Sequence, residues 1–182
     1  MIEFDDGVCH LYDNPLGIMT NAPSFPWQLE NLRQYTGMSA QNSPPLTLAG
    51  QALIVTGHGQ GMWGLPGDYT PPSRFVRLAV LTHFSDQQAD ASGNLNLGQH
   101  ILNTFTIPRG IIVDKDAEGK IISVETTQWA TFRDLTNRVL YFKTYDNHTL
   151  RKIDLRALDF SASGIKRIAM FGNNETVIDL TE

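Results

Sequence analysis

The sequence predicts an α+β fold made of antiparallel sheet and a block of helices, and three observations support it. Hairpin-like strands open the chain, helical patterns occupy its middle, and strands separated by tight polar turns return after residue 120. Strands and helices therefore come in blocks and do not alternate. Such an order favours antiparallel sheet over a doubly wound parallel one.

The first strands are expected to form a hairpin. Ile2 and Phe4 alternate with polar neighbours, Asp6-Gly7 supplies a turn, and residues 8–12 resume the strand. Residues 16–19 form a short apolar run, which predicts a buried strand. A hairpin at the first residue leaves a sheet edge exposed unless another segment covers it. We therefore expect a further segment to lie against this hairpin.

The first helix is predicted over residues 26–35. The Ser, Asn, Pro and Gly residues of 38–51 indicate a loop, and residues 52–55 are expected to form a short strand. The expected apolar face of the helix consists of Trp27, Leu29, Leu32 and Tyr35. A glycine-rich turn follows around His58. It lacks the Lys-Ser or Lys-Thr step of a phosphate-binding loop, and the scattered histidines lack the spacing of a zinc site.

Thr70 can cap a second helix with Pro71 in its first turn, running to about residue 83. A third helix is expected over residues 97–105. Residues 114–119 are a polar turn. The remaining apolar segments predict strands over 124–133, 138–145 and 150–155, followed by tail segments at 165–171 and 176–180.

Composition indicates one globular domain. The chain has 182 residues, of which 41% are hydrophobic, and a formal net charge of -5. The acidic balance and the lack of a basic cluster argue against nucleic-acid binding. The sequence contains no apolar run long enough to cross a membrane and no signal peptide after Met1. A single cysteine rules out an internal disulfide.

Four stretches of the chain stand out together. They are residues 12–23, residues 64–77, residues 127–129 with 133–137, and residues 141–147. The second reads Gly-Leu-Pro-Gly-Asp-Tyr-Thr-Pro-Pro-Ser-Arg-Phe-Val-Arg and is long enough to be specific. In this order and spacing they resemble the choloylglycine hydrolase family, which includes conjugated bile salt hydrolases and penicillin V acylases.

The resemblance implies the C-terminal portion of an αββα sandwich, the fold of the N-terminal nucleophile (Ntn) hydrolases, with residues 1–182 as a single partial domain. It also implies cleavage of a linear amide by a cysteine exposed as the first residue, whose α-amine serves as its base. The implied substrates are conjugated bile salts, penicillin V and related N-acyl amides, with no cofactor and no metal. The step from Thr70 to Arg74 is somewhat more similar to the acylases.

The sequence departs from the family at its start. Ile2 follows Met1, and the first matching stretch would lie near the middle of a family member. The resemblance therefore implies that the part with the nucleophile is missing, and we expect the chain alone to be inactive. We expect it to pair with that part or to form a homo-oligomer, in the cytoplasm or periplasm. The alternative is a non-catalytic remnant that acts as a binding or interaction module.

The resemblance assigns catalytic roles to Asn21 and Arg74. Asn21 would donate to the oxyanion, and Arg74 would place a positive charge near the nucleophile. Without the resemblance, a turn-forming Asn and a solvated helical Arg are the simpler interpretations. Arg77 is expected on the surface or in a salt bridge.

Other residues are expected to be structural. Cys9 lies in a strand and is expected to be a small buried residue and not a nucleophile, because His10 points to the opposite face and cannot serve as its base. Asp68 is expected to be a carboxylate of a turn or of the entry to a helix, although a catalytic role is the alternative. Met62 and Trp63 are expected to pack in the core, although an acyl pocket is the alternative.

Overall fold

The computed structural model describes residues 1–172 and Leu180, and it divides the chain into two compact units, Met1–Gln87 and Gln88–Glu182. Every strand pair among the described residues is antiparallel. The expected combination of helices and antiparallel sheet is therefore confirmed, whereas the organisation as one partial domain stays a prediction. Of the expected tail segment 176–180, only Leu180 lies within the described residues.

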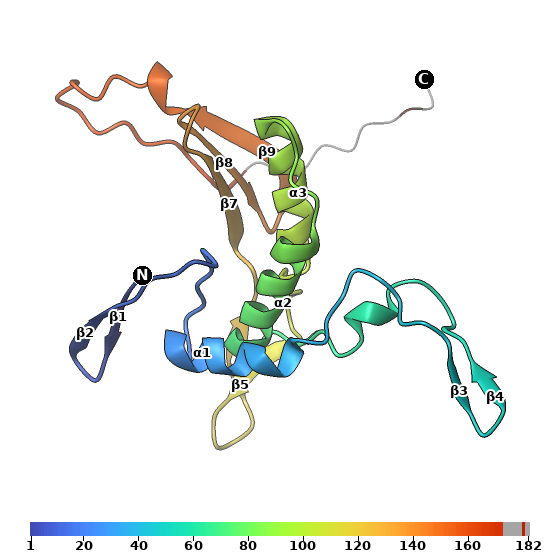
Figure 1. Cartoon of the computed structure of the whole chain (residues 1–182). Coiled ribbons are helices and arrows are strands. Elements are labelled where there is room, and N and C mark those ends of the chain that lie inside the picture. Colours follow the sequence, from blue (N-terminus) through green and yellow to red (C-terminus); the bar gives the residue numbers. More distant parts are fainter. Residues whose placement is uncertain (173–179, 181–182) are drawn as a thin grey trace. The chain divides into compact units, whose positions relative to one another are not determined.

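The first unit contains two hairpins and two α-helices (Figure 1). The hairpins are linked to the helices through loops and two single-turn 3-10 helices, Arg33–Tyr35 and Gln60–Met62. The regular elements are β1 (Ile2–Asp5), β2 (Val8–Leu11), α1 (Phe25–Leu32), β3 (Leu46–Leu48), β4 (Gln51–Leu53) and α2 (Pro71–Phe84).

The β1–β2 hairpin forms as predicted. Asp6 and Gly7 have φ of 46° and 78°, the positive values that a tight hairpin turn of type I′ needs at both central residues. Opposite residues in an antiparallel pair share a face, so Ile2 lies beside Leu11 and Phe4 beside Cys9. This face is apolar, and all four of its side chains are exposed.

The polar face of the same hairpin is the better covered one. Glu3, which pairs with His10, accepts a hydrogen bond from the backbone N–H of Phe25 at the start of α1, at 3.0 Å. The prediction of a buried Cys9 is therefore wrong, because no described segment of the first unit covers the face on which Cys9 lies.

The core of the first unit lies between α1 and α2. The rings of Phe25 and Phe75 meet edge to face with centroids 6.2 Å apart, and Ile18 packs with them. The apolar face predicted for α1 is wrong in part, because Trp27 and Leu29 are exposed and the buried residues are Phe25 and Gln28. Helix α2 forms where it was predicted.

The strand predicted over residues 16–19 does not form. Gly17 donates to the Asn14 carbonyl, and the Asn14 side chain donates to the Ile18 carbonyl, so the segment is a turn. Only Ile18 of this run is buried, while Leu16 and Met19 are exposed. A short apolar run fits a turn with one inward side chain as well as it fits a strand.

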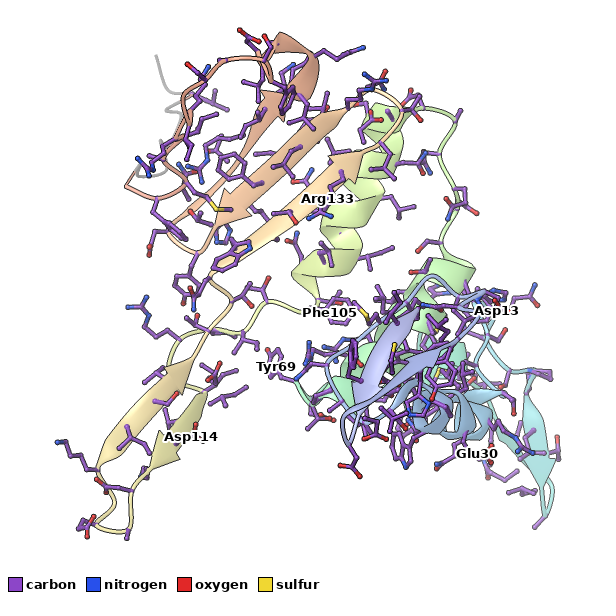
Figure 2. All side chains as sticks on the ribbon, turned by 90° about the vertical axis from the view of Figure 1, so that its left-hand side faces the viewer. Asp13, Glu30, Tyr69, Phe105, Asp114 and Arg133 are labelled. Carbon is purple, nitrogen blue, oxygen red and sulfur yellow. The ribbon has the colours of Figure 1, made fainter. Side chains whose placement is uncertain are left out.

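The second unit contains a helix, a hairpin and a three-stranded sheet. Asp90 caps the helix by accepting from the Gly93 N–H at 2.7 Å, which starts it earlier than the predicted residue 97. Figure 2 shows Asp114 on the hairpin and Arg133 on the sheet. The elements are α3 (Ala91–Asn103), β5 (Ile112–Lys115), β6 (Ile121–Glu125), β7 (Trp129–Asp134), β8 (Val139–Thr144) and β9 (Asn147–Asp154).

Helix α3 packs against strand β7. A Cβ atom at Gly98 would lie 3.4 Å from the Phe132 ring, an ordinary contact distance, so this position of the helix faces the strand. The tail returns to the sheet, where Arg151 lies over the Phe142 ring and donates to the Met170 carbonyl at 2.9 Å. Within residues 1–172, no helix has the length and apolar character to span a bilayer.

Candidate active site

The structure brings the two predicted catalytic residues together. Asn21 lies in the bend before α1, and Arg74 lies in the first turn of α2. The Arg74 Nη2 donates to Asn21 Oδ1 at 2.5 Å, although 53 residues separate them in the sequence. Asn21 is exposed and Arg74 is half-buried, so this pair lies at the surface of the first unit.

This contact fixes the orientation of the Asn21 amide. A guanidinium group only donates hydrogen bonds, so the atom that faces it must be the carbonyl oxygen Oδ1. The Nδ2 amino group therefore lies on the branch that points away from Arg74. A charge-assisted bond to Oδ1 also polarises the amide and strengthens Nδ2 as a donor. The pair can thus present a positively polarised N–H to an acceptor in solvent.

Further hydrogen bonds hold Arg74 and the two residues that flank Asn21. The Arg74 Nε donates to the Tyr69 carbonyl at 3.1 Å, which leaves Nη2 aimed at Asn21. Tyr69 is labelled in Figure 2. On the other side, Gln28 of α1 donates to the Ala22 carbonyl at 2.7 Å and to the Thr20 hydroxyl at 3.3 Å. The neighbours of Asn21 in the sequence are therefore both bonded to one buried side chain.

Arg77 holds the turn that carries Tyr69. It donates to the carbonyls of Pro66 and Asp68 at 2.7 and 3.0 Å, and only 5% of the residue is exposed. Burial lowers the pKa of its guanidinium, and the nearby charge of Asp68 acts in the opposite direction. The surface position predicted for Arg77 is wrong, because the turn at residues 66–69 covers this face of α2, whereas the predicted salt bridge stays a prediction.

Asp68 forms the entry to α2, as predicted. Its carboxylate accepts from the backbone N–H and hydroxyl of Thr70 at 2.9 and 2.6 Å, and from the Ser73 hydroxyl at 2.6 Å. These bonds lower the pKa of Asp68 from 3.8 to about 2, and the bond from Ser73 makes the largest contribution to this shift. The Thr70 hydroxyl bonds to Asp68, so Thr70 precedes the helix without capping it through its side chain.

The remaining predicted residues lie outside this cluster. Trp63 is 86% exposed, so the prediction that it packs in the core is wrong, while Met62 is half-buried. His58 lies in an exposed turn. No group of three or more His, Cys, Asp or Glu side chains in the described part of the chain is arranged to hold a metal ion.

The sequence did not predict the burial of Gln28 or of Arg77. Both are polar residues on helices, where the usual expectation is exposure to solvent. Periodicity alone gives a weak indication for Gln28, because it lies three residues after the buried Phe25 on α1.

Comparison with known proteins identifies the class of protein to which this geometry belongs. Residues 1–168 match the family described as linear amide C-N hydrolases, choloylglycine hydrolase family, and the chain belongs to that family. A bile salt hydrolase/transferase from Clostridium perfringens is 33% identical over 157 residues, which are 86% of this chain and 46% of that protein. One from Bifidobacterium longum is 30% identical over 164 residues, 90% of this chain and 50% of the relative.

Solved structures agree with this assignment. A variant of conjugated bile acid hydrolase from Clostridium perfringens has a TM-score of 0.81 at 29% identity, covering 99% of this chain and 53% of that structure. Penicillin V acylase from Agrobacterium tumefaciens shares the fold, with a TM-score of 0.62 at 21% identity. The match covers 87% of this chain and 42% of the acylase. The chain spans about half the length of the relatives it matches and corresponds to their C-terminal part.

Proposed function

We propose that this chain supplies the oxyanion-binding half of a cysteine-dependent linear amide hydrolase. The observation that carries the proposal is the bond from Arg74 to Asn21 Oδ1, which directs the Asn21 Nδ2 group outward. Family membership supports the reaction class, and this geometry supports an oxyanion-binding part for the chain in that reaction.

The reaction follows from the resemblance to the Ntn hydrolases. The thiolate of a cysteine in the other half attacks the amide carbonyl carbon, and the π electrons of the carbonyl become an oxyanion. Asn21 Nδ2 donates to that oxyanion. The C–N bond then breaks, and the amine leaves with a proton from the α-ammonium group. Water afterwards hydrolyses the thioester, which releases the acid and restores the thiol.

Conjugated bile salts are the first substrates to test. Bile salt hydrolase/transferases from three bacteria are at least 30% identical to this chain over 80–90% of its length. The acylase-like character of the step from Thr70 to Arg74 makes penicillin V the second, and other N-acyl amides follow.

The exposed apolar face of the β1–β2 hairpin favours the proposal that a partner covers it. Side chains on the covered face of an antiparallel sheet are normally apolar and those on the solvent face polar. Here Ile2, Phe4 and Leu11 are 64, 72 and 77% exposed, while the opposite face contacts α1 through Glu3. A polypeptide equivalent to the first half of the relatives is the occupant that we propose, whether it is joined to this chain or separate.

The test combines this chain with the half of the Clostridium perfringens relative that it does not match. The panel contains glycine- and taurine-conjugated bile salts, penicillin V and simple N-acyl amides, and release of the amine is measured. We expect turnover that disappears when the cysteine at the start of the added half is replaced by alanine. A folded complex that cleaves none of the three classes would refute the proposal.

The alternative is a non-catalytic binding module, and the same apolar face favours it. It predicts association without turnover. Phe4→Asp should abolish association with the added half under either function, whereas Leu135→Asp, at an exposed turn of the second unit, should not. Solution mass of the chain alone shows whether the face also pairs with a second copy.

A further inference from the structure

We propose that Gln28 is a positioning residue that holds Asn21 in its productive orientation, an inference that rests on the function proposed above. Gln28 touches neither the Asn21 side chain nor Arg74 in its hydrogen bonds. It acts through the backbone and the hydroxyl group on the two sides of Asn21.

The contacts of Gln28 bracket a single residue. Its Nε2 atom donates to the Ala22 carbonyl at 2.7 Å and to Thr20 Oγ1 at 3.3 Å. Because α1 is packed against α2 through Phe25 and Phe75, Gln28 provides a fixed point from which both bonds extend. Asn21 is itself exposed and lies in a bend outside any helix or strand, so the bonds to its neighbours limit its freedom.

Stability of the core does not explain a glutamine at this position. Gln28 is only 2% exposed, and among the described residues its Oε1 atom is buried with no hydrogen-bond partner. Burying an acceptor without a partner is destabilising, whereas an apolar side chain of the same length has no such group. At this position glutamine differs from methionine in the hydrogen bonds that it donates to the segment around Asn21.

Two anchors then define the direction of the Asn21 amide. Arg74 binds Oδ1 of the side chain, and Gln28 binds the flanking residues. With only one of these two anchors, the segment around Asn21 remains free to rotate. Without Gln28 it can turn about the contact with Arg74, and Nδ2 moves away from the place where the oxyanion forms. Displacements of about 1 Å at a reacting centre lower rates by roughly 100-fold.

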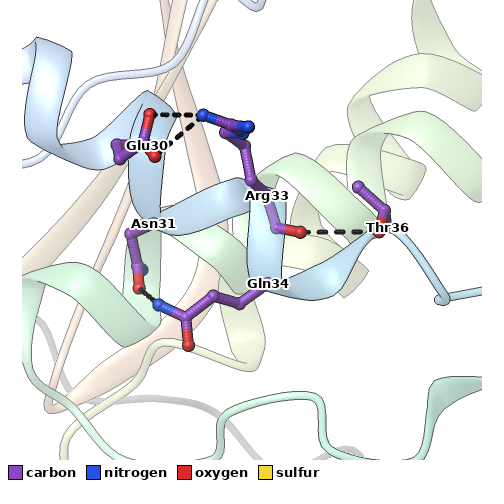
Figure 3. A network of polar contacts seen from close by, with 5 residues as sticks. All are labelled: Glu30, Asn31, Arg33, Gln34 and Thr36. Atoms are coloured by element: carbon purple, nitrogen blue, oxygen red, sulfur yellow. Dashed lines mark hydrogen bonds and ion pairs between the residues drawn. The ribbon is translucent and has the colours of Figure 1, made fainter.

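The variant that tests this is Gln28→Met, which keeps the length of the side chain and removes its donor. The matched control is Gln34→Met in the exposed network of Figure 3, where Gln34 Nε2 donates to Asn31 Oδ1 at 3.2 Å. Both residues lie on the same helical segment of the first unit, but only Gln28 is buried.

The first measurement uses the full chain and needs no activity. We expect Gln28→Met to lower the backbone ¹⁵N order parameter of Asn21 to below about 0.6 while the melting temperature stays equal or rises. Gln34→Met should change neither. An unchanged order parameter in Gln28→Met, or a lower melting temperature with Asn21 still rigid, would show that Gln28 only supports the fold and would overturn the proposal.

The second measurement uses the reconstituted complex. We expect Gln28→Met to lower kcat about 10- to 100-fold with KM within twofold of the wild type, because orientation and not substrate binding is lost. A raised KM with unchanged kcat would overturn the proposal. If the wild-type complex cleaves no amide, the proposed function fails, and the order parameter of the chain alone still decides the role of Gln28.

Discussion

Removing the amide of Asn21 is the perturbation with the most sharply defined consequence. In Asn21→Ala the Arg74 guanidinium keeps its bond to the Tyr69 carbonyl, so the helix entry stays in place while the outward Nδ2 donor is lost. Loss of one preorganised oxyanion donor costs about 3–4 kcal/mol, or roughly 10²–10³ in kcat. Because Asn21 is exposed, the free energy of unfolding should change by less than about 1 kcal/mol.

Asn21→Asp separates the two functions of the side chain. A carboxylate still accepts from Arg74, but it has no donor and adds negative charge at the proposed position of the oxyanion. The kcat of the reconstituted complex should therefore fall at least as far as in Asn21→Ala. The control is Asn31→Ala in Figure 3, an asparagine of the same unit whose Oδ1 accepts only from Gln34 among the bonds drawn, and it should keep wild-type kcat. A kcat within threefold of wild type in both Asn21 variants would refute the oxyanion role.

Three further predictions concern the supports of the site. Arg77→Met removes the bonds from a buried cation to two carbonyls and should lower the free energy of unfolding by about 2–4 kcal/mol in urea titrations. The control, Arg33→Met on the surface, should change that free energy by about 0.5 kcal/mol or less. Equal effects of the two substitutions would contradict the structure. Phe75→Ala should cost about 3–5 kcal/mol in the same titration, because the ring is 1% exposed, and a loss below 1 kcal/mol would contradict its place in the core. The folded pKa of Asp68, about 2, lies below its ordinary 3.8, so its contribution to stability is present above about pH 4 and is lost as the pH falls through about 2. Asp68→Asn should flatten the melting temperature between pH 4 and 2, and a slope equal to that of the wild type would contradict this.

The sequence was sufficient to predict the hairpin at Asp6-Gly7 and helix α2, because their determinants are local. Neighbouring residues determine both features: the turn needs positive φ at two residues, and the helix starts at Pro71. The closeness of Asn21 and Arg74 is not local. Only the resemblance to the family assigns both residues to one catalytic site, and the structure adds their contact and the amide atom that faces the guanidinium.

What the sequence could not predict depends on which surfaces are covered. Arg77 and Gln28 are polar yet buried, and Trp63 and Cys9 are exposed although their side chains favour burial. These outcomes depend on tertiary contacts: the turn at residues 66–69 covers Arg77, and no described segment of the first unit covers the apolar face of the β1–β2 hairpin. Patterns of neighbouring residues do not contain that information.

The affinity of the reconstituted complex for a bile acid aldehyde, compared with the corresponding alcohol, tests the central claim most directly. An aldehyde forms a tetrahedral adduct with the cysteine and places an oxyanion before Asn21, whereas the alcohol resembles only the bound ground state. We predict that Asn21→Ala weakens binding of the aldehyde about 10²–10³-fold relative to the alcohol, and that Asn31→Ala leaves the ratio unchanged. A ratio unaltered by Asn21→Ala would contradict the assignment of this chain as the oxyanion-binding half.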